Sequence, residues 1–100
     1  MFVVVPGFGP VPVASAFVER LRGLRRRPAG SALALRGGSV HGFGMDRELV
    51  VVGLDRDLTV IASRVLAPNR VVWIRGASWM VELPAGTKPP PPGTRLGLHG

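Results

Sequence analysis

Glycine and proline recur so often along this chain that every apolar segment between them is short. The 100 residues include 14 glycines and 10 prolines. No apolar run approaches the ~20 residues that a membrane-spanning helix requires. The chain is still apolar enough to bury a core, with 46% hydrophobic residues and a mean hydropathy of +0.29, which is unlike a disordered protein. We therefore expect one domain built from short elements with turns between them.

Most of these short segments predict β-strands. Phe2–Val5 is a β-branched run that stops at Pro6-Gly7, which predicts a strand followed by a turn. In Ser31–Arg36, small and large residues alternate, so Leu33 and Leu35 would share one face of a strand. These two segments predict strands near the beginning and in the first half of the domain.

Two hairpins are expected in the second half of the chain. Leu49–Leu54 and Leu58–Val65 are apolar runs on either side of a short polar loop, and they predict an antiparallel pair. Arg70–Arg75 and Trp79–Leu83 predict another pair across Gly76, Ala77 and Ser78.

One segment has a helical period. Val13, Phe17, Leu21 and Leu24 recur with the spacing of one helix face, which predicts an amphipathic helix from 13 to 24. Pro12 suits its first turn.

The expected fold is therefore mainly β (α+β). We predict a small jelly-roll-like β-sandwich or partly open barrel, with the N-terminal amphipathic helix covering one open end or edge. Residues 1–88 would form the compact domain. Residues 89–100 begin with four consecutive prolines and are rich in glycine, which predicts an extended and partly mobile tail.

Three motifs occur in an order that resembles a known family. They read RLRGLRRRP at 20–28, SVHGFGM at 39–45 and VELPAG at 81–86. The chain thereby resembles the uncharacterised bacterial and archaeal family called domain of unknown function 192, over about residues 13 to 88. The resemblance implies a small jelly-roll-like β-sandwich, and it implies no established reaction.

The chain departs from that family pattern at two places. A carboxylate that usually follows the second motif falls on Val50 here, so the chain cannot use an acid or a ligand at this position. After the third motif the family continues with a short helix, whereas this chain has its proline run.

The distinctive polar residues suggest a candidate ligand site. Gly42 and Gly44 bracket Phe43 and allow unusual backbone angles there. Glu82 would face away from Val81 and Leu83, so it becomes a buried acid in need of a partner if that face is inward. The candidate ligand-binding residues are Arg36, Ser39, His41, Met45 and Glu82. The alternative is that His41 bonds a backbone carbonyl or Glu82 and simply fixes its loop, and we favour it.

Two catalytic or metal arrangements can be written from the same residues, and we favour neither. Copper ligation by His41, Met45 and His99 would need the loose tail to supply a ligand. A triad of Ser39, His41 and Glu82 would make a hydrolase, but no nucleophile elbow is recognisable. We therefore expect no catalytic residue, no metal and no cofactor.

The charge of the chain suggests a second kind of partner. Its formal net charge is +7, and twelve of the 13 basic residues are arginine. The candidate polyanion-binding residues are Arg20, Arg22, Arg25, Arg26 and Arg27. We favour solvated cations at a helix end and biased composition over a selected nucleic-acid surface, since aromatic residues for base stacking are scarce. Trp73 and Trp79 are expected to be mainly structural, and the alternative is that one of them is exposed as a contact point.

The remaining features narrow the class of protein. Cysteine is absent, which excludes disulfides, thiol nucleophiles and cysteine-ligated metals. The N-terminal apolar run has no preceding basic residue and is broken by prolines, which is unlike a secretory signal peptide. We therefore expect a cytoplasmic protein that does not bind a membrane. The leading hypothesis is a small non-enzymatic module that binds an unidentified ligand or protein partner, as a monomer or weak dimer. The alternative is a basic polyanion- or nucleic-acid-binding accessory protein, and a hydrolase is third.

Overall fold

The computed structural model describes residues 1–14, 30–42 and 45–100 of the chain. These residues form nine β-strands and no helix. They therefore include no helix that could cross a membrane. The strands are β1 (Phe2–Val5), β2 (Gly9–Pro12), β3 (Leu33–Arg36), β4 (Ser39–His41), β5 (Leu49–Leu54), β6 (Val60–Leu66), β7 (Val71–Trp73), β8 (Trp79–Pro84) and β9 (Gly97–His99). All strand pairs within the sheets are antiparallel. The described part of the protein is therefore all-β, with a sandwich-like arrangement.

A four-stranded sheet in the order β3-β8-β5-β6 lies at the centre. Its inner strands β8 and β5 are buried on both faces, which agrees with their continuous apolar sequences. Successive residues of β8 alternate between two separate apolar clusters, with Val81 in one and Met80 in the other. The central sheet consequently has a core on each side.

The first core lies between one face of the central sheet and the sheet β2-β1-β9. Val3 and Val5 of β1 and Val11 of β2 are all almost fully buried there. They pack with central-sheet residues such as Val52 and Val81. The alternation of β1, in which every second valine is buried, explains why the predicted strand at Phe2–Val5 is confirmed.

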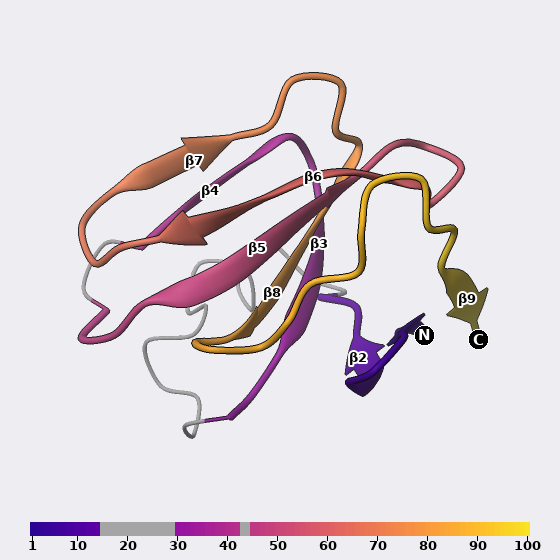
Figure 1. The fold of residues 1–100 in the computed structure, drawn as a ribbon, viewed down its shortest axis with the longest axis horizontal. Helices are drawn as coiled ribbons and strands as arrows, with labels where there is room; N and C mark the ends of the chain where they lie inside the picture. The colour runs from indigo at the N-terminus through magenta and orange to yellow at the C-terminus, as the bar shows by residue number, and fades with distance from the viewer. Residues whose placement is uncertain (15–29, 43–44) are drawn as a thin grey trace.

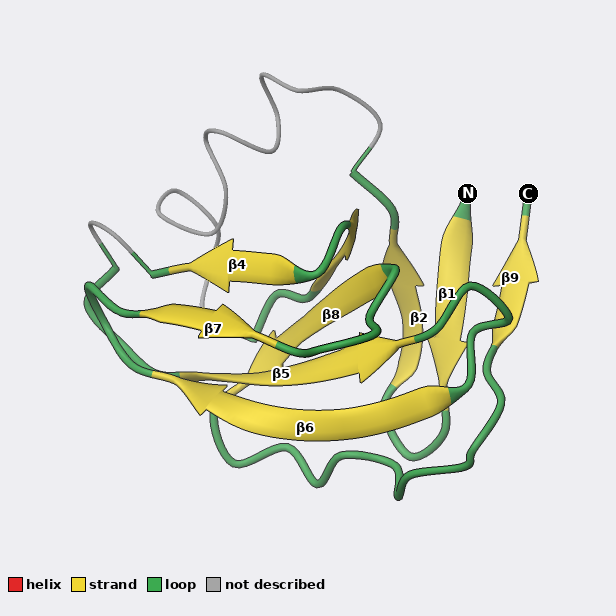
Figure 2. Ribbon diagram, turned by 90° about the horizontal axis from the view of Figure 1, so that it is seen from above, coloured by secondary structure: helices red, strands yellow, loops and turns green. Residues whose placement is uncertain are grey.

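The second core lies on the opposite face of the central sheet. Leu33 and Leu35 of β3 both belong to it, as their shared face predicted. It is covered by β4 and β7, which pair with each other to form a separate two-stranded sheet (Figure 2). Val40 of β4 and Ile74, just after β7, are buried in this core.

The predicted hairpin of Arg70–Arg75 with Trp79–Leu83 is wrong. β7 pairs with β4, whereas β8 pairs with β3 and β5. The turn at 74–77 does reverse the chain, because the Ala77 amide donates to the Ile74 carbonyl. The same turn also moves the chain from the outer layer to the central sheet, so that β8 becomes buried on both faces and β7 does not.

Gly37 and Gly38 connect β3 in the central sheet to β4 in the outer layer. The Gly37 amide donates to the Ser78 carbonyl, and the Ile74 amide donates to the Gly38 carbonyl. The two connections therefore lie side by side and carry two chain segments between layers together.

The other predicted hairpin is confirmed. β5 and β6 pair in the expected order, with a register shift near Gly53 and Leu54. In the connecting loop, the Asp55 carboxylate accepts hydrogen bonds from the backbone amides of Asp57 and Thr59, at 2.9 and 3.0 Å.

The predicted helix is wrong at its first residues. Val13 forms a bridge with Ala34, and the Ala14 amide donates to the Ala34 carbonyl at 2.9 Å. Both residues extend the β structure, because the Val13 amide donates to the carbonyl of Met1, just before β1, and the Ala14 amide donates to β3. The remainder of the predicted helix, from 15 to 24, lies outside the described residues.

The segment 89–100, expected to be a loose tail, is built into the β structure. The Val60 amide donates to the Thr94 carbonyl, and the Leu96 amide donates to the Leu58 carbonyl. Leu96 is 5% exposed and belongs to the first core. β9 then pairs with β1, which places the two ends of the chain side by side (Figure 1).

Candidate functional site

Glu82 occupies the position that its sequence context predicts. It is 4% exposed and lies on the second-core face of β8, where its cross-strand neighbours are Leu33 and Val51. It is the buried charged residue of the described part of the chain, and it has an interaction partner. A carboxylate in such surroundings needs that partner to offset its lost hydration.

Ser39 and His41 face away from Glu82. Because Val40 between them is buried in the second core, alternation along β4 directs Ser39 and His41 to the outer side of the β4–β7 sheet. His41 is accordingly exposed.

Arg36 and Met45 lie apart from each other, on opposite sides of the central sheet. The Arg36 guanidinium sits 4.5 Å from the centre of the Trp79 ring, on the first-core side of β3. Met45 is half-buried against the second core, next to Gly42. The five candidate ligand residues are therefore not gathered in one hollow, and their individual ligand-binding roles stay predictions.

The positions of these residues also bear on the hydrolase triad and on the copper site. A triad of Ser39, His41 and Glu82 is not assembled, because the first two lie outside the layer in which Glu82 is buried. His99 stacks on Phe2 in the β2-β1-β9 sheet, with ring centres 5.3 Å apart. That sheet and β4 cover opposite faces of the central sheet, so His99 is remote from His41. Within the described ranges, no three histidine or acidic residues form a metal-binding group.

The candidate polyanion-binding residues lie outside the described residues. This holds for Arg20, Arg22, Arg25, Arg26 and Arg27. Their role stays a prediction.

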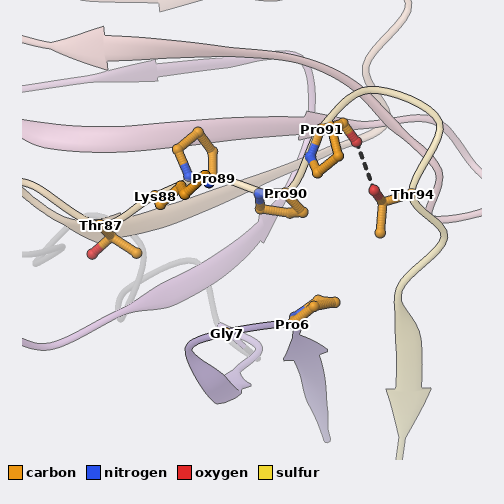
Figure 3. Close-up of a pocket in the computed structure, with 8 residues that line it drawn as sticks. All are labelled: Pro6, Gly7, Thr87, Lys88, Pro89, Pro90, Pro91 and Thr94. Carbon is orange, nitrogen blue, oxygen red and sulfur yellow. Dashed lines mark hydrogen bonds between the residues drawn. The ribbon is translucent and has the colours of Figure 1, made fainter.

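A pocket of about 510 Å³ opens elsewhere, where two distant segments meet. One wall is the turn between β1 and β2, closed by the Phe8 amide donating to the Val5 carbonyl, with Gly7 at φ 82°. The other wall is the stretch Thr87–Thr94, which leaves β8 and crosses toward β6 (Figure 3). Proline fixes the backbone of this second wall, since its ring locks φ.

Local hydrogen bonds shape the second wall. The Thr87 amide donates to the Pro84 carbonyl, which turns the chain after β8. At the far end the Thr94 hydroxyl donates to the Pro91 carbonyl at 2.7 Å (Figure 3). Between these turns Pro90 is buried and anchors the run on the domain.

The lining of the pocket is mostly apolar, with one cation. Its residues are Pro6, Gly7, Thr87, Lys88, Pro89, Pro90, Pro91 and Thr94. Lys88 is the lysine of this chain and is exposed, while the two threonines carry hydroxyl groups. Proline rings beside one ammonium group suit a ligand that has an apolar body and an anionic end.

Sequence reasoning missed this pocket because its walls are separated by about 80 residues. The proline run was the available signal, since a rigid extended segment makes a wall that keeps its shape without a bound ligand. The run predicts a tail instead, because nothing in the neighbouring sequence indicates that Leu96 and β9 attach the chain beyond it to the rest of the domain.

The outer face of the β4–β7 sheet carries a second unusual feature. Trp79 is buried, as a core residue would be, whereas Trp73 is 72% exposed, which agrees with the alternative that one of the two is exposed. Trp73 lies directly opposite Ser39, and His41 lies opposite Val71. Since partners in an antiparallel pair share a face, these four side chains form one outer surface.

Comparison with known proteins supports the fold and gives no function. No family model matches the chain, so membership of domain of unknown function 192 stays a prediction. No curated protein matches it either. The chain is similar to the crystal structure of a protein of unknown function from Novosphingobium aromaticivorans, with a TM-score of 0.71 and 16% sequence identity over 98% of this chain and 84% of the other. The likeness shows that this arrangement of strands occurs in a solved structure.

Proposed function

We propose that this protein is a small non-enzymatic module that binds an amphiphilic anion in the pocket between Pro6-Gly7 and Thr87–Thr94. The observation that carries the proposal is the pocket itself, whose volume of about 510 Å³ lies within the range of small-molecule sites, about 300–1,000 Å³. Backbone hydrogen bonds close the turn of the first wall and hold the second wall on both sides of the proline run, so little ordering is needed on binding.

The composition of the lining supports binding over catalysis. No carboxyl, imidazole or thiol group is among the described residues that line the pocket. Proline rings offer an apolar surface, and the Lys88 ammonium offers one positive charge at an exposed position. An anionic end near Lys88 and an apolar chain along the prolines would use both features.

The test uses octanoate and its uncharged counterpart 1-octanol as probes in isothermal titration calorimetry. We expect octanoate to bind more tightly than octanol, because only octanoate gains the attraction of Lys88. Lys88→Gln should remove that difference, whereas Arg56→Gln, which removes an exposed cation from the β5–β6 loop, should leave it unchanged.

A second variant tests the location. Thr87→Phe places a ring at the half-buried wall of the pocket and should weaken both probes by about tenfold or more, since a filled pocket cannot accept an apolar chain. The proposal is overturned if Thr87→Phe leaves octanoate binding unchanged, or if neither probe binds the wild-type protein.

A further inference from the structure

The outer face of the β4–β7 sheet combines an open aromatic surface with small neighbours. Trp73 is the most exposed large hydrophobic residue in the described ranges. Its cross-strand partner Ser39 is small, and the next pair on the same face is His41 with Val71. The strand that holds Trp73 is fixed from beneath, because Val72 and Ile74 pack on the second core. The indole is therefore presented on a rigid support.

Two arginines flank this aromatic residue. Arg75 follows β7 by two residues, in phase with the outward Trp73, and Arg70 directly precedes β7 at the end of the sheet; both are exposed. Neither makes a salt bridge with any residue that the structure describes. The segments that carry the surface, 36–42 and 67–78, contain no aspartate or glutamate. The surface is thus positively charged as well as aromatic.

We propose that this face binds single-stranded nucleic acid, with a base stacked on Trp73 and backbone phosphates held by Arg70 and Arg75. Any base offers a flat ring to an exposed aromatic side chain, and arginine binds phosphate through paired hydrogen bonds. A duplex keeps its bases stacked inside, so it presents no free base to an indole. This site is separate from the pocket and does not depend on the proposed ligand.

An acidic protein is the competing partner for such a surface. A stable protein interface buries about 800 Å² on each partner around an apolar centre. The outer face offers Trp73 and the half-buried Val71 on two strands of three residues each, which is a small apolar centre. The combination of one open ring with arginines at both ends matches a nucleotide strand better.

Fluorescence anisotropy of a fluorescein-labelled dT15 oligonucleotide at 50 mM NaCl tests the aromatic contact. We expect Trp73→Ala to weaken binding by about tenfold and Trp73→Phe to retain most of it, because phenylalanine still stacks. Val65→Ala removes another exposed apolar side chain, 60% exposed on β6, and should leave binding unchanged. Thermal melts of each variant confirm that the protein is folded, and octanoate binding should be the same in all of them.

A salt titration tests the phosphate contacts. For single strands, each neutralised phosphate contributes about −0.7 to the slope of log affinity against log salt. Arg70→Gln and Arg75→Gln should each weaken binding and reduce the slope by about this amount, while Arg56→Gln should not. The proposal is overturned if Trp73→Ala binds dT15 like the wild type, if duplex DNA of the same length binds equally well, if polyglutamate competes as strongly as unlabelled dT15, or if the wild type does not bind.

Discussion

At the scale of single residues, Gly53 shows how closely the outer layer approaches the central sheet. It lies inside β5, yet it has no side chain to pack. A Cβ built at this position would lie 2.7 and 2.8 Å from the Cγ2 and Cδ1 atoms of Ile74. Ile74 is 4% exposed and belongs to the second core, so it fills the space that a side chain at 53 would occupy. The glycine therefore allows the turn after β7 to pack directly on β5.

This contact predicts a specific loss of stability. Gly53→Ala should lower the free energy of unfolding by about 1–3 kcal/mol, because the added methyl group overpacks a filled core. Ile74→Ala alone should cost about 2–5 kcal/mol through the cavity it leaves. In the double variant the alanine methyl at 53 partly fills that cavity, so the combined cost should be smaller than the sum. Urea unfolding of the four proteins measures this, and strictly additive losses would contradict the contact.

At the scale of elements, local patterns predicted most strands but not all of their partners. The β5–β6 hairpin was predictable, since two apolar runs and a short polar loop determine a local pairing. β7 and β8 are joined by a turn just as short, yet they belong to different sheets. The difference arises because β8 is apolar on both faces and requires the centre of a sheet, a property that acts through the whole fold rather than through the turn.

The candidate site was predictable only in part, for the same reason. The alternation of Val81, Glu82 and Leu83 predicted that Glu82 opposes its neighbours, and the structure buries it. Its surroundings could not be predicted, because the layer covering it comes from other strands. The exposure of Trp73 could not be predicted either, since β7 is too short for its three residues to show an alternating pattern.

The segment after the proline run provides a prediction with an internal control. Leu96 is 5% exposed and Leu98, two residues later, is 41% exposed. Leu96→Ala should cost about 2–4 kcal/mol, because it leaves a cavity in the first core, whereas Leu98→Ala should cost less than about 1 kcal/mol. Thermal and urea unfolding compare the two. Equal effects would show that this segment does not contribute to the core.

At the scale of the whole molecule, the three layers differ in how many neighbours their strands have. β5 and β8 are each paired on both sides, while β4 and β7 pair only with each other in the part of the chain that the structure describes. Strands with pairing on both sides and burial on both faces open only when the entire domain unfolds. The β4–β7 layer has an open outer face and should open with a smaller free energy.

Native-state hydrogen exchange measures this difference. Hydrogen-bonded amides in β5 and β8 should exchange with the free energy of global unfolding, and those in β4 and β7 should exchange through a local opening that costs less. A single opening free energy for all four strands would contradict the layered description.

The pairing of β1 with β9 constrains how the protein is made. Phe2 lies opposite His99, so one edge of β1 gains its neighbour only when residue 99 has been synthesised. Contacts between residues so far apart in sequence slow folding, because a long loop must close first. The N-terminal sheet is therefore completed after translation has passed residue 99, and until then that edge of β1 remains open to other extended chains.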